Sequence, residues 1–167
     1  TLLQVDQDDV PVSGFGSDGD YAVVPYTTAN FLYEKSGGTW KKVGSSPWKA
    51  AHPTVVRGST SPTSPPGSTT IVINTVTVNL LTNATVAAAV TAINTAAITG
   101  ITASNSGGAL VITNTAGTAI TLSGTGLSYF GLTAGTTPGI AVNYTNSIQY
   151  PTGSQAGDLW VKFTAPN

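Results

Sequence analysis

Hydrophobic and polar residues alternate over several short stretches of this chain, which is the period of a β-strand with one buried face. Near the start of the chain the alternation covers residues 19–26, 30–35 and 39–43. The segment 36–38 between the last two stretches contains two glycines, and glycine readily adopts the positive φ angles of a tight turn. The pattern predicts a small antiparallel meander.

The two faces of this meander are expected to differ. Along its middle strand, Phe31, Tyr33 and Lys35 fall on one side. Leu32 and Glu34 fall on the other, because successive side chains of a strand point to opposite faces. We therefore expect one packed face and one wetter face.

A second set of patterns begins near Thr69 and contains a helix. Residues 71–73 and 76–80 are predicted to be strands joined by a turn at Asn74 and Thr75. Four apolar residues then recur at helical spacings of four, three and four, namely Val86, Val90, Ile93 and Ala97. They predict an amphipathic helix over residues 84–97.

The ends of this helix and the strands after it also have sequence signals. Asn83 or Thr82 is expected to cap its start, and Gly100 follows its end. Beyond it, the chain predicts a hairpin, a further strand and a short turn or helix, at residues 101–104 with 109–113, 119–122 and 127–132. The fold class expected is mainly β with a small α+β unit, in which one amphipathic helix packs on a mainly antiparallel sheet.

Composition divides the chain into four segments. Residues 1–57 form an N-terminal β-meander module, and residues 58–68 form a linker rich in proline, serine and threonine. Residues 69–143 form a charge-free α+β module, and residues 144–167 begin a further β-module that resembles the first. The resemblance consists of a Gly-Asp pair before a strand in both places, and repetition and coincidence both stay open.

Charge is distributed very unevenly. All Asp, Glu, Lys, Arg and His residues lie in residues 1–57 or at Asp158 and Lys162, so residues 58–157 carry none. A free soluble domain normally keeps interspersed charges that hold its copies apart. A neutral, threonine-rich surface therefore favours a protein held permanently in an assembly. The alternative is that Ser, Thr and Asn alone solvate this surface, as in secreted bacterial β-proteins.

The residues that the chain lacks exclude several kinds of chemistry. It contains no cysteine, which excludes disulfides, thiolate metal sites and thiol catalysis. It contains no methionine, even at position 1, and we expect it to be a piece of a longer polypeptide. No membrane-spanning apolar run or signal peptide is visible in the sequence.

The positions of the carboxylates indicate a structural role in loops more than a catalytic one. There are seven, namely Asp6, Asp8, Asp9, Asp18, Asp20, Glu34 and Asp158. Most lie in predicted turns, where they satisfy their own backbone. Two carboxylates across a cleft would suffice for a glycosidase, and a Ca²⁺ site from Asp6, Asp8, Asp18 and Asp20 is conceivable, but no calcium-loop spacing occurs. We expect no metal.

No catalytic or cofactor-binding residue is predicted. His52 is the sole histidine and lies beside Pro53 in a predicted loop, with no partner indicated by a motif. The Gly-x-Ser-x-Gly pattern of serine hydrolases and the phosphate-binding glycine loop are absent. The net charge of −1 argues against a nucleic-acid partner.

Aromatic residues concentrate in the first module and suggest contacts. Trp40, Trp48, Tyr33 and Lys41 are candidates for an interface or for contacts with a glycan. A small domain also uses such residues as its core. We favour core or subunit interface over glycan binding.

The first module resembles the hairpins of tailed-phage virion proteins. The residues concerned are Gly19-Asp20-Tyr21 and Tyr33-Glu34-Lys35-Ser36-Gly37-Gly38-Thr39-Trp40, with a partial echo at Gly157-Asp158-Leu159-Trp160. The middle module is similar to the strand-helix-hairpin insert of phage structural proteins and of flagellar hook-associated proteins. This module includes Val76-Thr77-Val78 and Gly107-Gly108-Ala109-Leu110-Val111.

This resemblance implies a structural component of an extracellular phage particle, in the tail, fibre, baseplate or neck. Its expected partners are other copies of itself and other virion proteins, with neither nucleic acid nor membrane among them. A module that binds host-surface glycans is the first alternative. A flagellar or secreted surface protein is the second, and an enzyme such as a polysaccharide depolymerase is the least supported.

Overall fold

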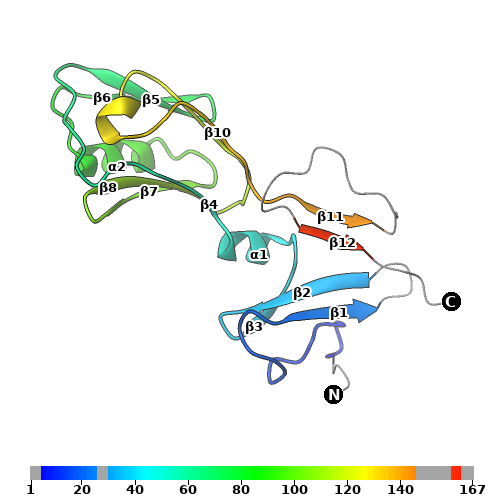
Figure 1. Cartoon of the computed structure of the whole chain (residues 1–167). Helices are drawn as coiled ribbons and strands as arrows, with labels where there is room; N and C mark the ends of the chain where they lie inside the picture. Colours follow the sequence, from blue (N-terminus) through cyan, green and yellow to red (C-terminus); the bar gives the residue numbers. More distant parts are fainter. Residues whose placement is uncertain (1–4, 26–29, 146–158, 163–167) are drawn as a thin grey trace. The chain divides into compact units, whose positions relative to one another are not determined.

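The computed structural model describes residues 5–25, 30–145 and 159–162, and its residues group into two compact units (Figure 1). The first unit comprises Thr1–His52 and Ile140–Asn167, and the second comprises Pro53–Gly139. Antiparallel sheets dominate the structure, which confirms the predicted mainly β fold class.

The predicted meander forms the centre of the first unit. Strands β1 (Tyr21–Pro25), β2 (Asn30–Ser36) and β3 (Thr39–Lys42) pair antiparallel in the order β1-β2-β3. Gly37 and Gly38 make the turn with φ angles of 62° and 73°, a conformation that costs other residues strain. The sequence prediction is confirmed here.

A buried lysine ties the N-terminal segment to this sheet. The Lys35 ammonium group donates hydrogen bonds to the backbone carbonyls of Ser13, Phe15 and Gly16, at 2.7, 2.8 and 2.7 Å. These three bonds use all three donors of the ammonium group, so its burial leaves no donor unsatisfied. On the same face lies the small apolar core of Ala22, Val24, Tyr33 and Trp40.

On the opposite face of the meander, β2 and β3 are covered by a helix that the sequence did not predict. Helix α1 (Ser46–Ala51) begins after Ser45, whose side chain accepts a hydrogen bond from the Trp48 N–H. Trp48 is the buried residue of this helix. This face is therefore mixed: Glu34 is buried, whereas Tyr21 and Val23 on β1 are 53% and 46% exposed, so the expected wetter face is confined to β1. A helix of six residues with one apolar anchor is too short to show helical periodicity.

Two further strands belong to the first unit. Strand β11 (Val142–Thr145) pairs in parallel with β12 (Leu159–Lys162). The strand expected after the second Gly-Asp pair is thus present, but its described partner is a parallel strand and not a hairpin. Residues 146–158 and 163–167, on which the predicted repeat also depends, lie outside the described residues.

The second unit contains two antiparallel sheets. One has the strand order β4-β8-β7, with β4 at Thr54–Arg57, β8 at Ala109–Asn114 and β7 at Ile101–Ser106. The other has the order β10-β9-β5-β6, with β10 at Gly135–Thr137, β9 at Ile120–Ser123, β5 at Thr69–Ile73 and β6 at Val76–Leu80. Both predicted hairpins, β5-β6 and β7-β8, are confirmed.

The predicted amphipathic helix joins these sheets. Helix α2 (Val86–Thr95) contacts β6, β7 and β8, and its buried residues are Val86, Ala89 and Ile93. Thr85, and neither Asn83 nor Thr82, caps its start. Ala97, expected in the apolar stripe, is exposed beyond the end of the helix. A short 3-10 helix, η1 (Leu127–Phe130), follows β9 and contributes Leu127 and Phe130 to the core.

The structure places the boundary between the units earlier than the sequence suggested. Thr54–Arg57, assigned to the first module, forms β4 of the second unit. Residues 58–68 form neither strand nor helix, as expected. However, Ser59 and Thr63 donate backbone hydrogen bonds to the carbonyls of Phe130 and Tyr129, both at 2.9 Å. This segment is therefore packed into the second unit.

Asn94 covers the open edge of β7. Its side-chain amide donates to the Ala103 carbonyl at 3.0 Å and accepts from the Ala103 N–H at 2.7 Å. The amide thus makes the two hydrogen bonds that a neighbouring strand would make. Natural sheets protect their edges against unwanted pairing in such ways.

We predict that Asn94→Ala exposes the Ala103 amide to exchange. Each lost bond is worth ~1 kcal/mol, so hydrogen exchange at Ala103, followed by NMR, should accelerate by roughly tenfold or more. Thr91→Ala is the matched control, because Thr91 lies on the same helix and its hydroxyl donates to the Ala87 carbonyl within that helix. Equal exchange rates in the two variants would contradict the assigned role of Asn94.

Candidate functional site

The residues predicted to contact a partner or glycan lie mostly in the interior of the first unit. Trp48, Tyr33 and Trp40 are only 1%, 7% and 8% exposed, and Lys41 is half-buried. A sugar stacks on an exposed ring face, which these three rings do not offer. Their role as core residues is the one that the structure supports.

These residues also do not form one patch. Tyr33 and Trp40 belong to the core on one face of the meander, whereas Lys41 pairs with Glu34 in register and so lies on the face that α1 covers. Replacing Trp40 by alanine would remove a core side chain. Loss of sugar binding in that variant would therefore not identify a sugar contact.

The loop carboxylates bond to the backbone. One oxygen of Asp6 accepts hydrogen bonds from the N–H groups of Asp8 and Val10, both at 2.9 Å. Asp18 accepts from the two glycines of the β2-β3 turn, and Asp20 from the backbone three residues earlier. Within residues 5–25, 30–145 and 159–162, no three His, Asp or Glu residues gather as metal ligands would.

A polar cluster that the sequence did not indicate lies between β2 and α1. An oxygen of Glu34 accepts a hydrogen bond from the Trp48 indole N–H at 2.5 Å. The same oxygen lies 3.2 Å from Nε2 of His52. The other ring nitrogen of His52 lies 3.0 Å from the Trp48 carbonyl oxygen, and the two rings stack with their centroids 4.4 Å apart.

Tyr21 extends this cluster on the neighbouring strand. It lies directly opposite Glu34 in the β1-β2 register, and it is 53% exposed. Burial of the phenol raises its pKa, and the negative charge of Glu34 and a hydrogen bond to it raise the pKa further. The phenol therefore stays neutral to a higher pH than a free tyrosine.

The geometry of the cluster suits holding α1 in place better than catalysis. Both ring nitrogens of His52 are occupied by Glu34 and by the Trp48 carbonyl. In the described part of the chain, neither nitrogen is hydrogen-bonded to a serine or threonine hydroxyl, so the nucleophile–base pair of a hydrolase is not formed there. No sequence motif indicates this contact, because its members come from separate elements that only tertiary packing brings together.

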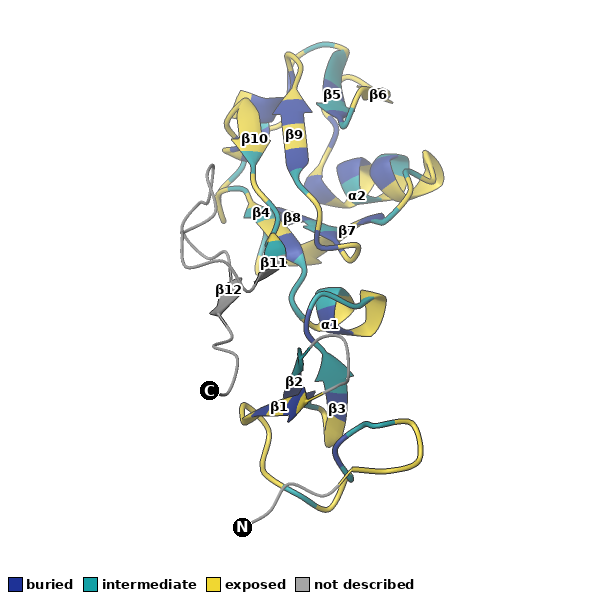
Figure 2. Ribbon diagram, turned by 90° about the vertical axis from the view of Figure 1, so that its right-hand side faces the viewer, coloured by how far each residue is buried: buried dark blue, intermediate teal, exposed yellow. Residues whose placement is uncertain are grey.

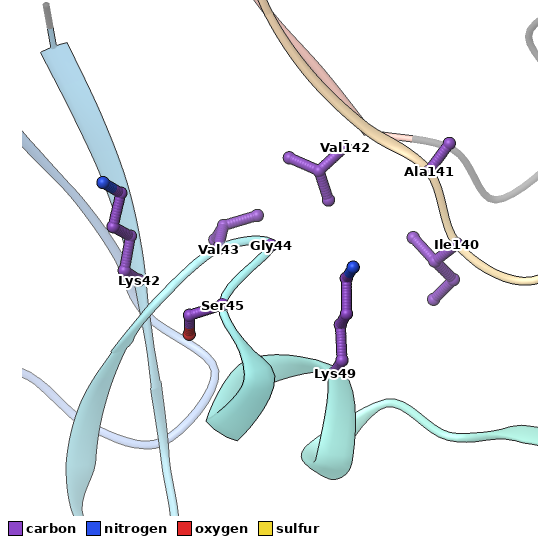
Figure 3. Close-up of a pocket in the computed structure, with 8 residues that line it drawn as sticks. All are labelled: Lys42, Val43, Gly44, Ser45, Lys49, Ile140, Ala141 and Val142. Carbon is purple, nitrogen blue, oxygen red and sulfur yellow. The ribbon is translucent and has the colours of Figure 1, made fainter. Parts of the chain in front are cut away.

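The first unit also has an open pocket of about 450 Å³ (Figure 3). It is lined by residues 42–45, by Lys49 and by residues 140–142. The Lys42 ammonium group lies over the Phe31 ring, 3.2 Å from its centroid. Lys49 alone extends its amine towards Ile140 and Val142 (Figure 3). Ligand sites usually have several converging polar groups, and this pocket does not.

We predict that Glu34→Gln lowers the pKa of Tyr21 towards its usual value of 10.0, because the variant removes the negative charge beside the phenol. The measurement is an NMR titration of ¹³C-labelled tyrosine. Tyr33 is the internal control, since burial, Asp9 and Asp6 raise its pKa, and Glu34 does not contribute. An unchanged Tyr21 titration would contradict the assigned contact.

The same shift predicts a dependence of stability on pH. Because the folded-state pKa of Tyr21 is raised, its contribution to the free energy of unfolding is complete below about pH 10 and is lost as the pH rises through the folded-state pKa. Tyr21→Phe should make stability less sensitive to pH in that alkaline range. Urea unfolding followed by tryptophan fluorescence reports on the first unit alone, because Trp40, Trp48 and Trp160 all belong to it.

No protein-family model matches the chain, and no curated protein or solved structure is significantly similar to it. None of the helices in the described residues is long and apolar enough to cross a membrane.

Proposed function

We propose that this chain is a structural subunit of an extracellular phage particle and acts by assembling with copies of itself and with other virion proteins. The observation that carries the proposal is the complete lack of charged side chains in residues 58–157. We assign it no catalytic role. A tail, fibre, baseplate or neck position is consistent with the resemblance of its hairpins to virion proteins.

The exposed surface of the second unit supports association without charge desolvation. On the outer face of its four-stranded sheet, the hydroxyl groups of Thr121 and Thr136 lie 2.9 Å apart. Thr77, Asn79 and Ser123 are also exposed there. Burying hydroxyl and amide groups that keep hydrogen-bond partners costs much less than burying ions. Such a face suits permanent contact with another neutral surface.

The alternative of a glycan-binding module loses its main support. It rested on Trp40, Trp48, Tyr33 and Lys41, and the three aromatic residues of this set are buried. The proposal of a flagellar or secreted surface protein rests on the same neutral unit, and electron microscopy of the native particle that contains the chain would separate it from a virion protein.

We predict that association of this chain is insensitive to salt. Sedimentation velocity over a range of protein concentrations should give oligomers whose dissociation constant changes little between low salt and about 1 M salt, where exposed charges are screened beyond roughly 3 Å. A chain that stays monomeric at every concentration would overturn the proposal. Association that weakens strongly with salt would contradict the neutral interface.

A further inference from the structure

Among the described strands at the edges of the two sheets in the second unit, β6 is the least protected. Figure 2 shows it as the outermost strand beyond β5. The edge strand β4 carries Arg57, β7 is covered by Asn94, and β10 has three residues and precedes Pro138. Strand β6 has five residues, none of them charged or proline. Charges, proline, short length and covering groups are the usual protections of an edge.

The hairpin turn determines which backbone groups of β6 face outwards. Asn74 and Thr75 form a two-residue turn with φ angles of 47° and 76°, as in a type I′ hairpin. In such a hairpin the closing pair, Ile73 and Val76, exchanges backbone hydrogen bonds, and every second pair after it does the same. The backbone N–H and C=O groups of the residues between them therefore point away from β5.

These outward groups belong to Thr77 and Asn79. Both residues are exposed, and in the described part of the chain no strand pairs with β6 on that side. The edge thus offers two donors and two acceptors to an added strand. This kind of binding is β-strand addition, in which main-chain hydrogen bonds join the partner to the sheet.

The side chains of β6 suit a second copy of the same strand. Its sequence alternates as Val76-Thr77-Val78-Asn79-Leu80, with the same pattern in both directions. An antiparallel copy related by a two-fold axis at Val78 places Val76 opposite Leu80 and Thr77 opposite Asn79. Apolar residues then meet apolar ones on the core face, and polar residues meet polar ones on the outer face.

Exposed apolar groups beside the edge favour this partner. Val76 is 39% exposed, although it lies on the core face, and Leu81, the residue after β6, is 79% exposed. In the two-fold arrangement, Leu80 of the partner subunit covers Val76. The β6 strand of the second copy carries no charged residue, and neither does the strand with which it pairs, because residues 58–157 contain none.

We infer that β6 is the surface through which two copies of this chain associate, as antiparallel neighbours about a two-fold axis at Val78. Four backbone hydrogen bonds form, between Thr77 of each copy and Asn79 of its partner. The two four-stranded sheets become one continuous eight-stranded sheet. This inference rests on the proposed function, because it names the contact by which the structural subunit assembles.

A proline at the edge tests the backbone contact. Thr77→Pro removes the outward N–H in both copies, hence two of the four hydrogen bonds, while its own pairing with β5 does not use that group. The dissociation constant should rise at least tenfold. Thr77→Val is the matched control, because it keeps the N–H and should associate like the unchanged chain. Sedimentation velocity measures association, and circular dichroism checks that each variant folds.

A cysteine at the axis tests the register. The chain has no cysteine, so Val78→Cys introduces a single thiol. Val78 and its symmetry mate form a pair without hydrogen bonds, whose Cα atoms lie about 4.5 Å apart, within the range for a disulfide. Mild oxidation of the full chain should give a covalent dimer on a non-reducing gel. Ser123→Cys, on the inner strand β9, is the control and should remain monomeric on the same gel.

The outcomes separate this inference from the proposed function. If the unchanged chain is a monomer, both fall. If it associates and Thr77→Pro associates equally well, the contact at β6 is wrong and the proposed function stands. If Thr77→Pro does not fold, the cysteine experiment decides: a covalent dimer formed by Val78→Cys and not by Ser123→Cys supports the contact, and equal or no cross-linking overturns it.

Discussion

The lack of charge in residues 58–157 is the constraint on which the structure of the second unit depends. Apart from the Ser106 carbonyl, which accepts a hydrogen bond from Arg57, side chains that satisfy unpaired backbone groups here are neutral amides and hydroxyls. Asn94 does this at the edge of β7, and the buried Asn114 amide bonds to Thr118 and to the Ala116 N–H. Thr85 does it at the start of α2. Amides and hydroxyls thereby make the hydrogen bonds to backbone groups that charged side chains partly provide in most domains.

The first unit follows the opposite principle, because it buries two charged residues at neighbouring positions of one strand. Lys35 and Glu34 lie on opposite faces of β2, and each bonds to a segment that covers its face. Lys35 joins the N-terminal loop to the sheet, and Glu34 joins α1 to it through Trp48 and His52. A buried charge is tolerated only with such partners. The central strand is therefore fixed from both sides.

This contrast is the physical basis for separating the roles of the two units. In the second unit only Arg57 is charged. A surface formed by the remaining residues neither repels its own copies nor loses ion hydration when it is covered, so it suits lasting contact. The structure indicates where such contact forms. The other edge strands described in the second unit are protected against pairing, whereas β6 is not. Because β6 carries no charge, a second copy of the strand can pair with it without charge repulsion.

Elements with local sequence signals could be predicted from the residues alone. The meander, the two hairpins and α2 follow from residue periods and turn residues within a few positions of each other. Tertiary structure alone decided the rest: that residues 54–57 pair with β8, that α1 covers Glu34, and that His52 has an acidic partner. These contacts join residues from different elements, and alternation or spacing carries no information about which elements meet. Packing also turned Tyr33, Trp40 and Trp48 inwards, because a unit this small needs them in its core.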